Sequence, residues 1–277
     1  MDICFEQRWL RRCATFAYPR DPFRRRDHEV APIPRKVARA FVVEHHYSRS
    51  FPVARWNYGL FTRGGALVGV AVFSEPAQKA VFDPLPRDAA TDLGRFVLLD
   101  QVGFGGELCF LTQCMAHLQK KGLAGFVSFS DPFPRTTRAG ETVFAGHLGR
   151  IYQFKGATYL GQQRGDWVRL LDDGRILSPR ALAKVRAQDK GWRYVVRDLV
   201  AVGASPPVEA TPAALTDWLD AELPRITRRV KHPGNHKYVF PLDPAAARCL
   251  PPSQRYPRIA LPPYVSCVAQ RLLARAA

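Results

Sequence analysis

The sequence G-R-F-V-L-L-D-Q-V-G-F-G-G-E-L-C-F-L-T-Q-C-M-A-H-L-Q-K-K, residues 94–121, decides the fold of this chain. It opens with an apolar run over 94–99 that predicts a strand. A glycine-rich turn follows, and a helix is predicted over about 107–121. That helix carries apolar residues at helical spacing, namely Leu108, Leu111, Met115 and Leu118. A strand, a glycine turn and a helix in succession indicate an α/β unit.

Further strands and helices are predicted on both sides of this stretch. Residues 125–130, G-F-V-S-F-S, are typical of a buried strand, which Asp131-Pro132 ends. The other predicted elements are a helix over 35–46, strands over 56–62 and 66–73 joined by the turn Arg63-Gly64-Gly65, a short helix over 147–154 and a strand over 157–161. This order resembles that of GNAT-type acyltransferases. The resemblance implies a mixed α/β fold with a central twisted sheet flanked by helices.

In the GNAT fold, the turn between a central strand and the next helix holds the pyrophosphate of an acyl-CoA on backbone N–H groups and the helix N-terminus. The resemblance therefore implies a cofactor site for acyl-CoA, such as acetyl-CoA, at Gly103, Gly105 and Gly106. The usual loop signature of these enzymes is not cleanly present. A plain strand-to-helix turn is the alternative interpretation.

We expect three parts along the chain: a basic N-terminal arm over 1–35, one catalytic domain over 36–245 and a C-terminal tail over 246–277. Residues 133–145 are interpreted as a loop inserted into the domain. Beyond residue 165, the pattern predicts a strand over 166–171, helices over 178–188 and 213–223, a surface loop over 204–212, and a basic loop leading into a strand within 225–242.

The charge of the chain indicates a polyanionic partner. Lys and Arg number 41 against 24 Asp and Glu, a formal net charge of +17. Such a protein gains affinity for nucleic acid because each phosphate that it neutralises releases counterions. Arginine outnumbers lysine, and its planar guanidinium suits phosphates and stacked bases. A GC-rich genome is an alternative cause of the arginine excess, but it does not account for the shortage of acidic residues.

Double-stranded DNA is therefore the expected partner. In the N-terminal arm, arginines are interleaved with aromatic residues, a pattern that suits phosphate contact and base stacking. An arm packed on its own domain is the alternative. The candidate DNA contacts are Arg24, Arg25, Arg26, Arg135, Arg138, Arg228, Arg229 and Lys231.

Composition also argues against several classes of protein. An apolar fraction of 47% is ordinary for a folded chain. No two cysteines have the Cys-X-X-Cys spacing of a zinc knuckle, and arginines interrupt the only candidate signal peptide. No apolar run is long enough to span a membrane. We therefore expect a cytoplasmic protein with reduced thiols and no membrane contact.

Three motifs contain candidate catalytic side chains. His46-Tyr47 ends the first predicted helix, and imidazole and phenol groups can both transfer protons, although a surface or capping role is the alternative. Asp131 ends a buried strand, where the carboxylates of open α/β sheets point into the ligand crevice. An ordinary turn before proline is the alternative for Asp131. In the third motif, His147 lies between two glycines and Tyr152 follows one helical turn later.

These motifs, in their order, resemble the Mom proteins of phages, which modify adenine in DNA. The resemblance spans roughly residues 37–240. It is carried by H-H-Y-S-R at 45–49, W-N-Y-G-L-F at 56–61 with G-V-A-V-F at 69–73, G-R-F at 94–96, F-S-D-P at 129–132, G-H-L-G-R-I-Y-Q at 146–153, Y-L-G at 159–161 and H-P-G-N-H-K-Y at 232–238.

The resemblance implies a transferase that places a carbamoylmethyl group on N6 of adenine in double-stranded DNA, a change that protects phage DNA from restriction. It also implies a small-molecule donor, for which an acyl-CoA has been considered, and an iron ion. The iron ligands would be His46, Asp131 and His147. The implied catalytic residues are His46, Tyr47, Arg95, Asp131 and Tyr152.

Two features depart from the family pattern. The segment between Asp131 and Gly146 is longer than expected and contains Arg135 and Arg138, which suggests an inserted loop or lid that contacts DNA. Cys109 stands where a serine is expected, which leaves the donor open.

A mechanism follows from these roles. Adenine lies inside the duplex, so the enzyme must flip it out and stack it on an aromatic ring such as Tyr47 or Trp56. Asp131 would accept a proton from N6, Tyr152 would protonate a leaving group, and Arg95 would bind a phosphate or carboxylate. Two other functions stay open: an acyl-CoA-dependent N-acyltransferase that acts on another amine, such as a hypermodified base, and a non-catalytic DNA-binding protein.

Overall fold

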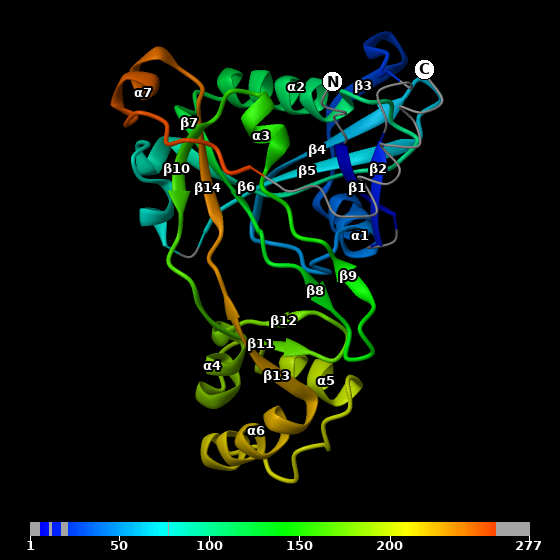
Figure 1. The fold of residues 1–277 in the computed structure, drawn as a ribbon, viewed down its shortest axis with the longest axis vertical. Helices are drawn as coiled ribbons and strands as arrows, with labels where there is room; N and C mark the ends of the chain where they lie inside the picture. The colour runs from blue at the N-terminus through cyan, green and yellow to red at the C-terminus, as the bar shows by residue number, and fades with distance from the viewer. Residues whose placement is uncertain (1–5, 11–12, 18–21, 77, 259–277) are drawn as a thin grey trace. The chain divides into compact units, whose positions relative to one another are not determined.

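The computed structural model describes residues 6–10, 13–17, 22–76 and 78–258 (Figure 1). The chain groups into two compact units. Unit 1 takes its described residues from 1–131, 147–162 and 236–277, and unit 2 consists of 132–146 and 163–235. The domain expected over 36–245 therefore takes in parts of both units, and the insertion expected over 133–145 lies within unit 2.

Unit 1 is built on a mixed sheet of seven strands in the order β10-β14-β7-β6-β5-β4-β3 (Figure 1). The strands are β3 (His28–Pro32), β4 (Ala54–Thr62), β5 (Leu67–Ser74), β6 (Ala90–Leu98), β7 (Gly125–Ser130), β10 (Thr158–Gln162) and β14 (His236–Pro241). All neighbours in this sheet are antiparallel except β6 and β7, which are parallel. The predicted mixed α/β fold is thus confirmed.

The parallel pair β6-β7 is hydrogen-bonded over a short stretch that ends with Asp92 opposite Val127. β6 continues to pair with β5 on its other side, and the register there shifts at Gly94. A Cβ at Gly94 would lie 2.4 Å from Ser74 Oγ, so the close approach of the two strands requires glycine. Such a bulge redirects the next side chain, which is Arg95. The opening between parallel strands is where ligands bind in open α/β sheets.

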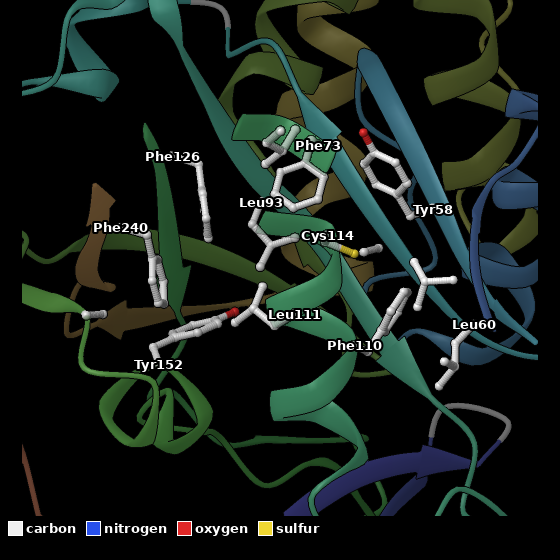
Figure 2. Close-up of a cluster of buried hydrophobic side chains, with 14 of the residues drawn as sticks. Tyr58, Leu60, Phe73, Leu93, Phe110, Leu111, Cys114, Phe126, Tyr152 and Phe240 are labelled. Atoms are coloured by element: carbon white, nitrogen blue, oxygen red, sulfur yellow. The ribbon is translucent and has the colours of Figure 1, made fainter. Parts of the chain in front are cut away.

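Three helices of unit 1 position residues around this opening. They are α1 (Arg35–His45), α2 (Gly106–Lys120) and α3 (Arg150–Phe154). α1 lies against β4, β5 and β6. α2 packs its apolar stripe, including Phe110 and Leu111, into a core cluster with Phe73 and Phe126 of the sheet (Figure 2). α3 contributes Tyr152 to the same cluster, so α3 is anchored by burial of that ring (Figure 2).

The described part of the expected N-terminal arm belongs to the fold. β1 (Glu6–Leu10) and β2 (Cys13–Ala17) form an antiparallel hairpin, a short 3₁₀ helix, η1, covers Arg25–Asp27, and β3 is the edge strand of the large sheet. Arg8 is 1% exposed and pairs with Glu107 of α2, with 2.6 Å between Nε and Oε1. These observations correct the expectation of a DNA-contacting arm for Arg8 and for 28–32. Residues 11, 12 and 18–21 lie outside the described residues.

The segment that follows β14 packs back on unit 1. It contains α7 (Pro244–Cys249), and then the Tyr256 hydroxyl donates to the Ala157 carbonyl oxygen at 2.6 Å. The described start of the expected tail over 246–277 is therefore bound to the sheet edge. Two further 3₁₀ helices, η2 (Lys79–Phe82) and η3 (Arg87–Ala89), precede β6.

Unit 2 has its own small sheet and its own core. Its strands are β8 (Arg135–Thr136), β9 (Thr142–Phe144), β11 (Asp166–Leu171), β12 (Ile176–Leu177) and β13 (Thr227–His232), and its helices are α4 (Pro179–Ala187), α5 (Trp192–Ala201) and α6 (Pro212–Ile226). β8 pairs with β9, and the order of the other sheet is β12-β11-β13. The helices bury a separate apolar cluster that includes Val185, Leu199, Leu215 and Leu219. Unit 2 therefore has the apolar core expected of an independent packing unit.

The H-P-G-N motif has a packing role in unit 2. Gly234 has φ +97°, and a Cβ there would lie 1.9 Å from the Gln163 carbonyl oxygen. The backbone N–H of Gly234 also donates to His232 Nδ1 at 3.0 Å. Glycine is required because the two chain segments that border unit 2 cross at van der Waals distance.

Most of the predicted elements are confirmed to within a few residues, including α1, β7, β11, α4 and α6. The basic loop predicted within 225–242 is wrong in its first half, because residues 227–232 form β13 and pair with β11. No element was predicted for α5 or for the β8-β9 hairpin. None of the helices in the described residues combines the length and apolar composition needed to cross a membrane.

Candidate active site

The candidate site residues come from three segments of unit 1 near the point where β6 and β7 part. The end of α1 supplies His46 and Tyr47, β6 supplies Arg95, and the chain after β7 supplies Asp131 and His147.

His46 and Tyr47 follow the last turn of α1. The His46 backbone N–H donates to the Val42 carbonyl at 2.9 Å, and the Ser48 backbone N–H donates to His46 Nδ1 at 3.1 Å. Since Nδ1 accepts, the neutral imidazole carries its proton on Nε2. The His46 ring stacks on Tyr47 with 4.2 Å between centroids, and Tyr47 meets the edge of the His147 ring at 6.4 Å.

Arg95 is held on β6 by the loop after α1. Its Nε donates to the Ser50 carbonyl oxygen at 2.9 Å, and its Nη2 donates to Ser50 Oγ at 2.6 Å. Burial lowers the pKa of Arg95, and the nearby Tyr47 phenol and Asp92 carboxylate oppose that change. Arg95 is thus a fixed cation beside the Tyr47 ring, which suits it to hold an anionic group.

Asp92 is a site residue that the sequence did not reveal. It lies on β6 at the last paired position before the strands part. Ser74 Oγ donates to its Oδ2 at 3.2 Å, whereas no partner for Oδ1 lies among the described residues. Burial raises the pKa of Asp92 to about 6, and the Ser74 hydrogen bond and Arg95 only partly offset this. A carboxyl group that titrates near neutrality is suited to accept a proton.

Tyr152 projects from α3 into the core and is 6% exposed. Its ring centroid lies 5.3 Å from that of Tyr238 and 5.8 Å from that of Phe240. Burial raises the pKa of Tyr152 well above its ordinary value, and Tyr47 and Asp92 add to the rise. The phenol is therefore protonated at neutral pH and can act as a proton donor but not as a base.

Asp131 and His147 are brought together by the backbone. The His147 N–H donates to the Asp131 carbonyl oxygen at 2.8 Å, although fifteen residues of unit 2 separate them in sequence. The next residue, Leu148, accepts hydrogen bonds from Tyr238 and from Gln153. This network fixes the loop that carries His147 next to the end of β7.

Two buried hydroxyl groups line β7 beside these residues. Ser128 and Ser130 are fully buried, and their hydroxyl groups lie beside the phenols of Tyr152 and Tyr238, respectively. Each serine therefore has a polar neighbour inside unit 1. Ser130 belongs to the F-S-D-P motif and Ser128 precedes it, but their burial is set by the sheet and not by local sequence.

The Gly103–Gly106 turn is packed from within the chain. Gly105 has φ +89° and precedes α2, and a Cβ on Gly106 would meet Val102 at 2.4 Å and Phe23 at 3.1 Å. Arg8 donates to the carbonyl oxygens of Val102 and Gly103 beneath the turn. Glu107, in the first turn of α2, is buried and paired with Arg8. The turn thus has a packing role within the chain, and the acyl-CoA site at Gly103, Gly105 and Gly106 stays a prediction.

The predicted iron site is not formed. In the described residues, no group of three or more His, Cys, Asp or Glu side chains is arranged to hold a metal ion. The predicted ligands His46, Asp131 and His147 are thus not arranged as such a group. In addition, His46 Nδ1 accepts a hydrogen bond from the Ser48 backbone N–H.

The predicted DNA contacts divide into exposed and internal residues. Arg24, Arg25 and Arg26 are exposed at η1, and Arg229 and Lys231 are exposed on β13. In unit 2, Arg135 is 7% exposed and its guanidinium lies 4.5 Å from the centroid of the Phe144 ring. Arg138 pairs with Asp172 at 3.1 Å, and Arg228 donates to Thr136. Arg135 and Arg228 make contacts within unit 2, and their role as direct DNA contacts stays a prediction.

The sheet order, the short parallel pair and the polar side chains near its opening define a mixed α/β protein with a candidate active site between β6 and β7. The chain belongs to the Mom protein family, whose model matches residues 27–258. The resemblance drawn from the motifs is therefore confirmed.

Three solved acetyltransferase-fold structures are similar at low identity. A tandem GNAT protein from the clavulanic acid biosynthesis pathway has 10% identity and a TM-score of 0.41, over 78% of this chain and 99% of its own. The ribosomal-protein-S18-alanine N-acetyltransferase from Escherichia coli has 14% identity and a TM-score of 0.34, over 54% and 88%. The IAA acetyltransferase from Bacillus cereus has 12% identity and a TM-score of 0.30, over 54% of this chain and 92% of its own. No curated protein sequence matches this chain significantly. Because all three TM-scores are below 0.5, these structures are not used to assign a function to this chain.

Proposed function

We propose that this protein is a DNA-modifying transferase that converts adenine in double-stranded DNA to N6-carbamoylmethyladenine. The observation that carries the proposal is the grouping of His46, Arg95, His147 and the buried Tyr152 around Tyr47 in unit 1, with the Asp131 backbone bonded to His147. Membership of the Mom protein family and the net charge of +17 support DNA as the substrate. The activity belongs in the cytoplasm, where it would mask phage DNA from restriction.

The chemistry follows from the groups present. The target adenine leaves the stack and its N6 attacks the methylene carbon of a small-molecule donor with a carbamoylmethyl group and a leaving group. The N6–C bond forms, the bond from carbon to the leaving group breaks, and the N6 proton passes to a carboxylate. Asp131 is our first assignment for this base, and Asp92 is a second carboxylate of suitable pKa.

The other side chains have positioning and acid roles in this scheme. Tyr152 holds its proton at neutral pH and donates it to the leaving group. Arg95, fixed by Ser50, binds a carboxylate or phosphate of the donor or DNA. Tyr47 is our first assignment for stacking the flipped base, and Trp56, whose ring lies 4.2 Å from the Arg55 guanidinium, is the alternative.

Nucleoside analysis tests this proposal. The full chain is co-expressed with a plasmid, the DNA is digested, and the nucleosides are separated and weighed by mass spectrometry. We expect carbamoylmethyl-deoxyadenosine with the wild type and none with D131A that keeps its fold by circular dichroism. An acylated amino-nucleoside instead would support an acyltransferase acting on another amine. Unmodified DNA with intact salt-sensitive binding would support a non-catalytic DNA-binding protein and overturn the proposal.

A further inference from the structure

One face of the small sheet in unit 2 is divided into an apolar half and a basic half. Side chains directly opposite each other in β11 and β13 share a face, and the face alternates along each strand. Leu171 and Thr227 lie at one end of this face and are buried beside the helical core of unit 2. At the other end, Arg169 is opposite Arg229, and Trp167 is opposite Lys231.

The basic half, which we name the β11-β13 strip, consists of Trp167, Arg169, Arg229 and Lys231. Trp167 is 50% exposed, and Arg229 and Lys231 are also exposed. The Arg229 guanidinium lies 4.8 Å from the centroid of the Trp167 ring, so the indole holds this cation in place by a cation–π contact. Arg169 donates to Thr227 Oγ1 at 3.2 Å, which leaves its charge unneutralised.

No carboxylate balances the strip. Within the described residues, Arg169, Arg229 and Lys231 take part in no ion pair, although other arginines of unit 2 do, such as Arg138 with Asp172. Like charges directly opposite each other destabilise a sheet. Three cations without a counter-charge on one face are therefore an electrostatic cost that binding of an anion would offset.

The geometry of the strip fits a repeating anion. Arg229 and Lys231 are two residues apart on one strand, which separates them by roughly 6.6 Å. Cations at this spacing can reach neighbouring phosphates of one DNA strand, because successive phosphates follow closely along the backbone, with a rise of roughly 3.4 Å per step along the helix axis. Arg228, which precedes Arg229, lies on the other face of the strand and donates to Thr136 Oγ1, so Arg229 and Lys231 are the two exposed cations on the face of the strip.

We propose that the β11-β13 strip is a docking surface for the sugar-phosphate backbone of double-stranded DNA. Unit 2 would then bind DNA through a surface that does not include the candidate active site of unit 1. The choice of DNA as the anion rests on the proposed function. The assignment of the strip as an anion-binding surface rests on the β11-β13 register, on the exposure of Trp167, Arg229 and Lys231, and on the lack of ion pairs for its cations among the described residues.

A pair of double variants of the full chain tests the strip. R229A/K231A removes the two exposed cations of the strip. R193A/R197A is the matched control, because it also removes two exposed arginines from unit 2, and Arg193 likewise lies over a tryptophan, Trp192, at 4.7 Å. Affinity for a labelled duplex is measured by fluorescence anisotropy over a range of salt concentrations, and circular dichroism melting confirms that each variant is folded.

We expect R229A/K231A to weaken duplex binding on the order of 30-fold at about 0.15 M salt and to reduce the slope of log K against log salt by roughly 2. W167A should weaken binding less, and W167F should restore most of it, since either ring can support the guanidinium. R193A/R197A should bind like the wild type. Equal affinity and slope for the two double variants would overturn the proposal.

The outcomes separate this proposal from the proposed function. Loss of binding in R229A/K231A without any modified nucleoside from the wild type would leave the strip standing and refute the enzymatic proposal. Full DNA affinity in R229A/K231A, with modified adenine still formed, would refute the strip and leave the enzyme standing.

Discussion

Arg8 and Glu107 are ninety-nine positions apart and form a buried ion pair, with Nε 2.6 Å from Oε1 and Nη2 2.9 Å from Oε2. The two-pronged contact ties the β1 strand to the first turn of α2. The same guanidinium also donates hydrogen bonds to carbonyl oxygens of the turn before α2, so β1 stabilises that turn from inside the protein.

Replacing one partner of this pair should destabilise the protein strongly. R8M leaves the Glu107 carboxylate buried without a counter-charge, which costs about 3–5 kcal/mol. The double variant R8M/E107M removes both charges, so we expect it to be more stable than R8M alone. Urea unfolding of the full chain at pH 7 measures both. Equal stability of R8M and the wild type would show that the pair does not form.

Asp92 should make stability depend on pH. Burial raises the pKa of Asp92 to about 6, above its value in the unfolded chain. The protonated carboxyl group therefore contributes fully to the free energy of unfolding in acid, and this contribution is lost as the pH rises through about 6. D92N cannot ionise, and it should gain of the order of 2 kcal/mol over the wild type between pH 4 and pH 7. Thermal melting across this range measures the gain.

Asp88 is a control for this measurement. It is exposed and paired with Lys79, which lowers the pKa of its carboxyl group. The sign is opposite, since its contribution is present at neutral pH and is lost in acid. D88N should therefore gain nothing on raising the pH. A parallel response of D92N and D88N would contradict the assignment.

Gly94 should not tolerate a side chain. A Cβ there would lie 2.4 Å from Ser74 Oγ, so G94A must displace the serine or the strand and with it Arg95. We expect G94A to lower both the melting temperature and DNA modification. S74A/G94A removes the clashing oxygen and should recover part of the stability. If G94A is as stable as the wild type, the bulge does not constrain Arg95.

Tyr152 should matter to the reaction more than to the fold. Y152F keeps the buried ring and removes the acidic proton, so we expect modification to fall by roughly 100-fold or more while the melting temperature changes little. Y256F is the matched control, because its hydroxyl group donates to the Ala157 carbonyl oxygen and is given no role in the reaction. Comparable activity of Y152F and the wild type would remove Tyr152 from the mechanism.

The sequence predicted the main elements of unit 1 because their signals are local. The apolar runs of β5 and β7 and the helical spacing in α2 depend on neighbours a few residues away. The motif residues His46, Tyr47 and Asp131 were predicted at element ends, as the structure has them, whereas His147 lies in the loop before α3 and not at the start of the helix predicted over 147–154. Their gathering, in contrast, depends on strands and loops that meet only in the folded sheet.

The residues that the sequence did not reveal are those with distant partners. Nothing near Arg8 in the sequence marks it as buried, because its partner is on α2. Asp92 falls before the apolar run that suggested a strand, and its burial comes from pairing with β5 and β7. β13 was interpreted as a loop because Arg228, Arg229 and Lys231 obscure the alternation that pairs it with β11.

Both parts of unit 2 leave unit 1 and return to it at neighbouring positions. The first excursion departs after Asp131 and re-enters at His147, whose N–H bonds the Asp131 carbonyl oxygen. The second departs after Gln162 and re-enters at His236, which faces Gln162 across β10 and β14. Each junction has the span of an ordinary hairpin turn. Evolution can therefore lengthen, trim or exchange unit 2 without moving a strand of the catalytic sheet, and we expect changes in DNA preference among relatives of this chain to accumulate in that exchangeable part.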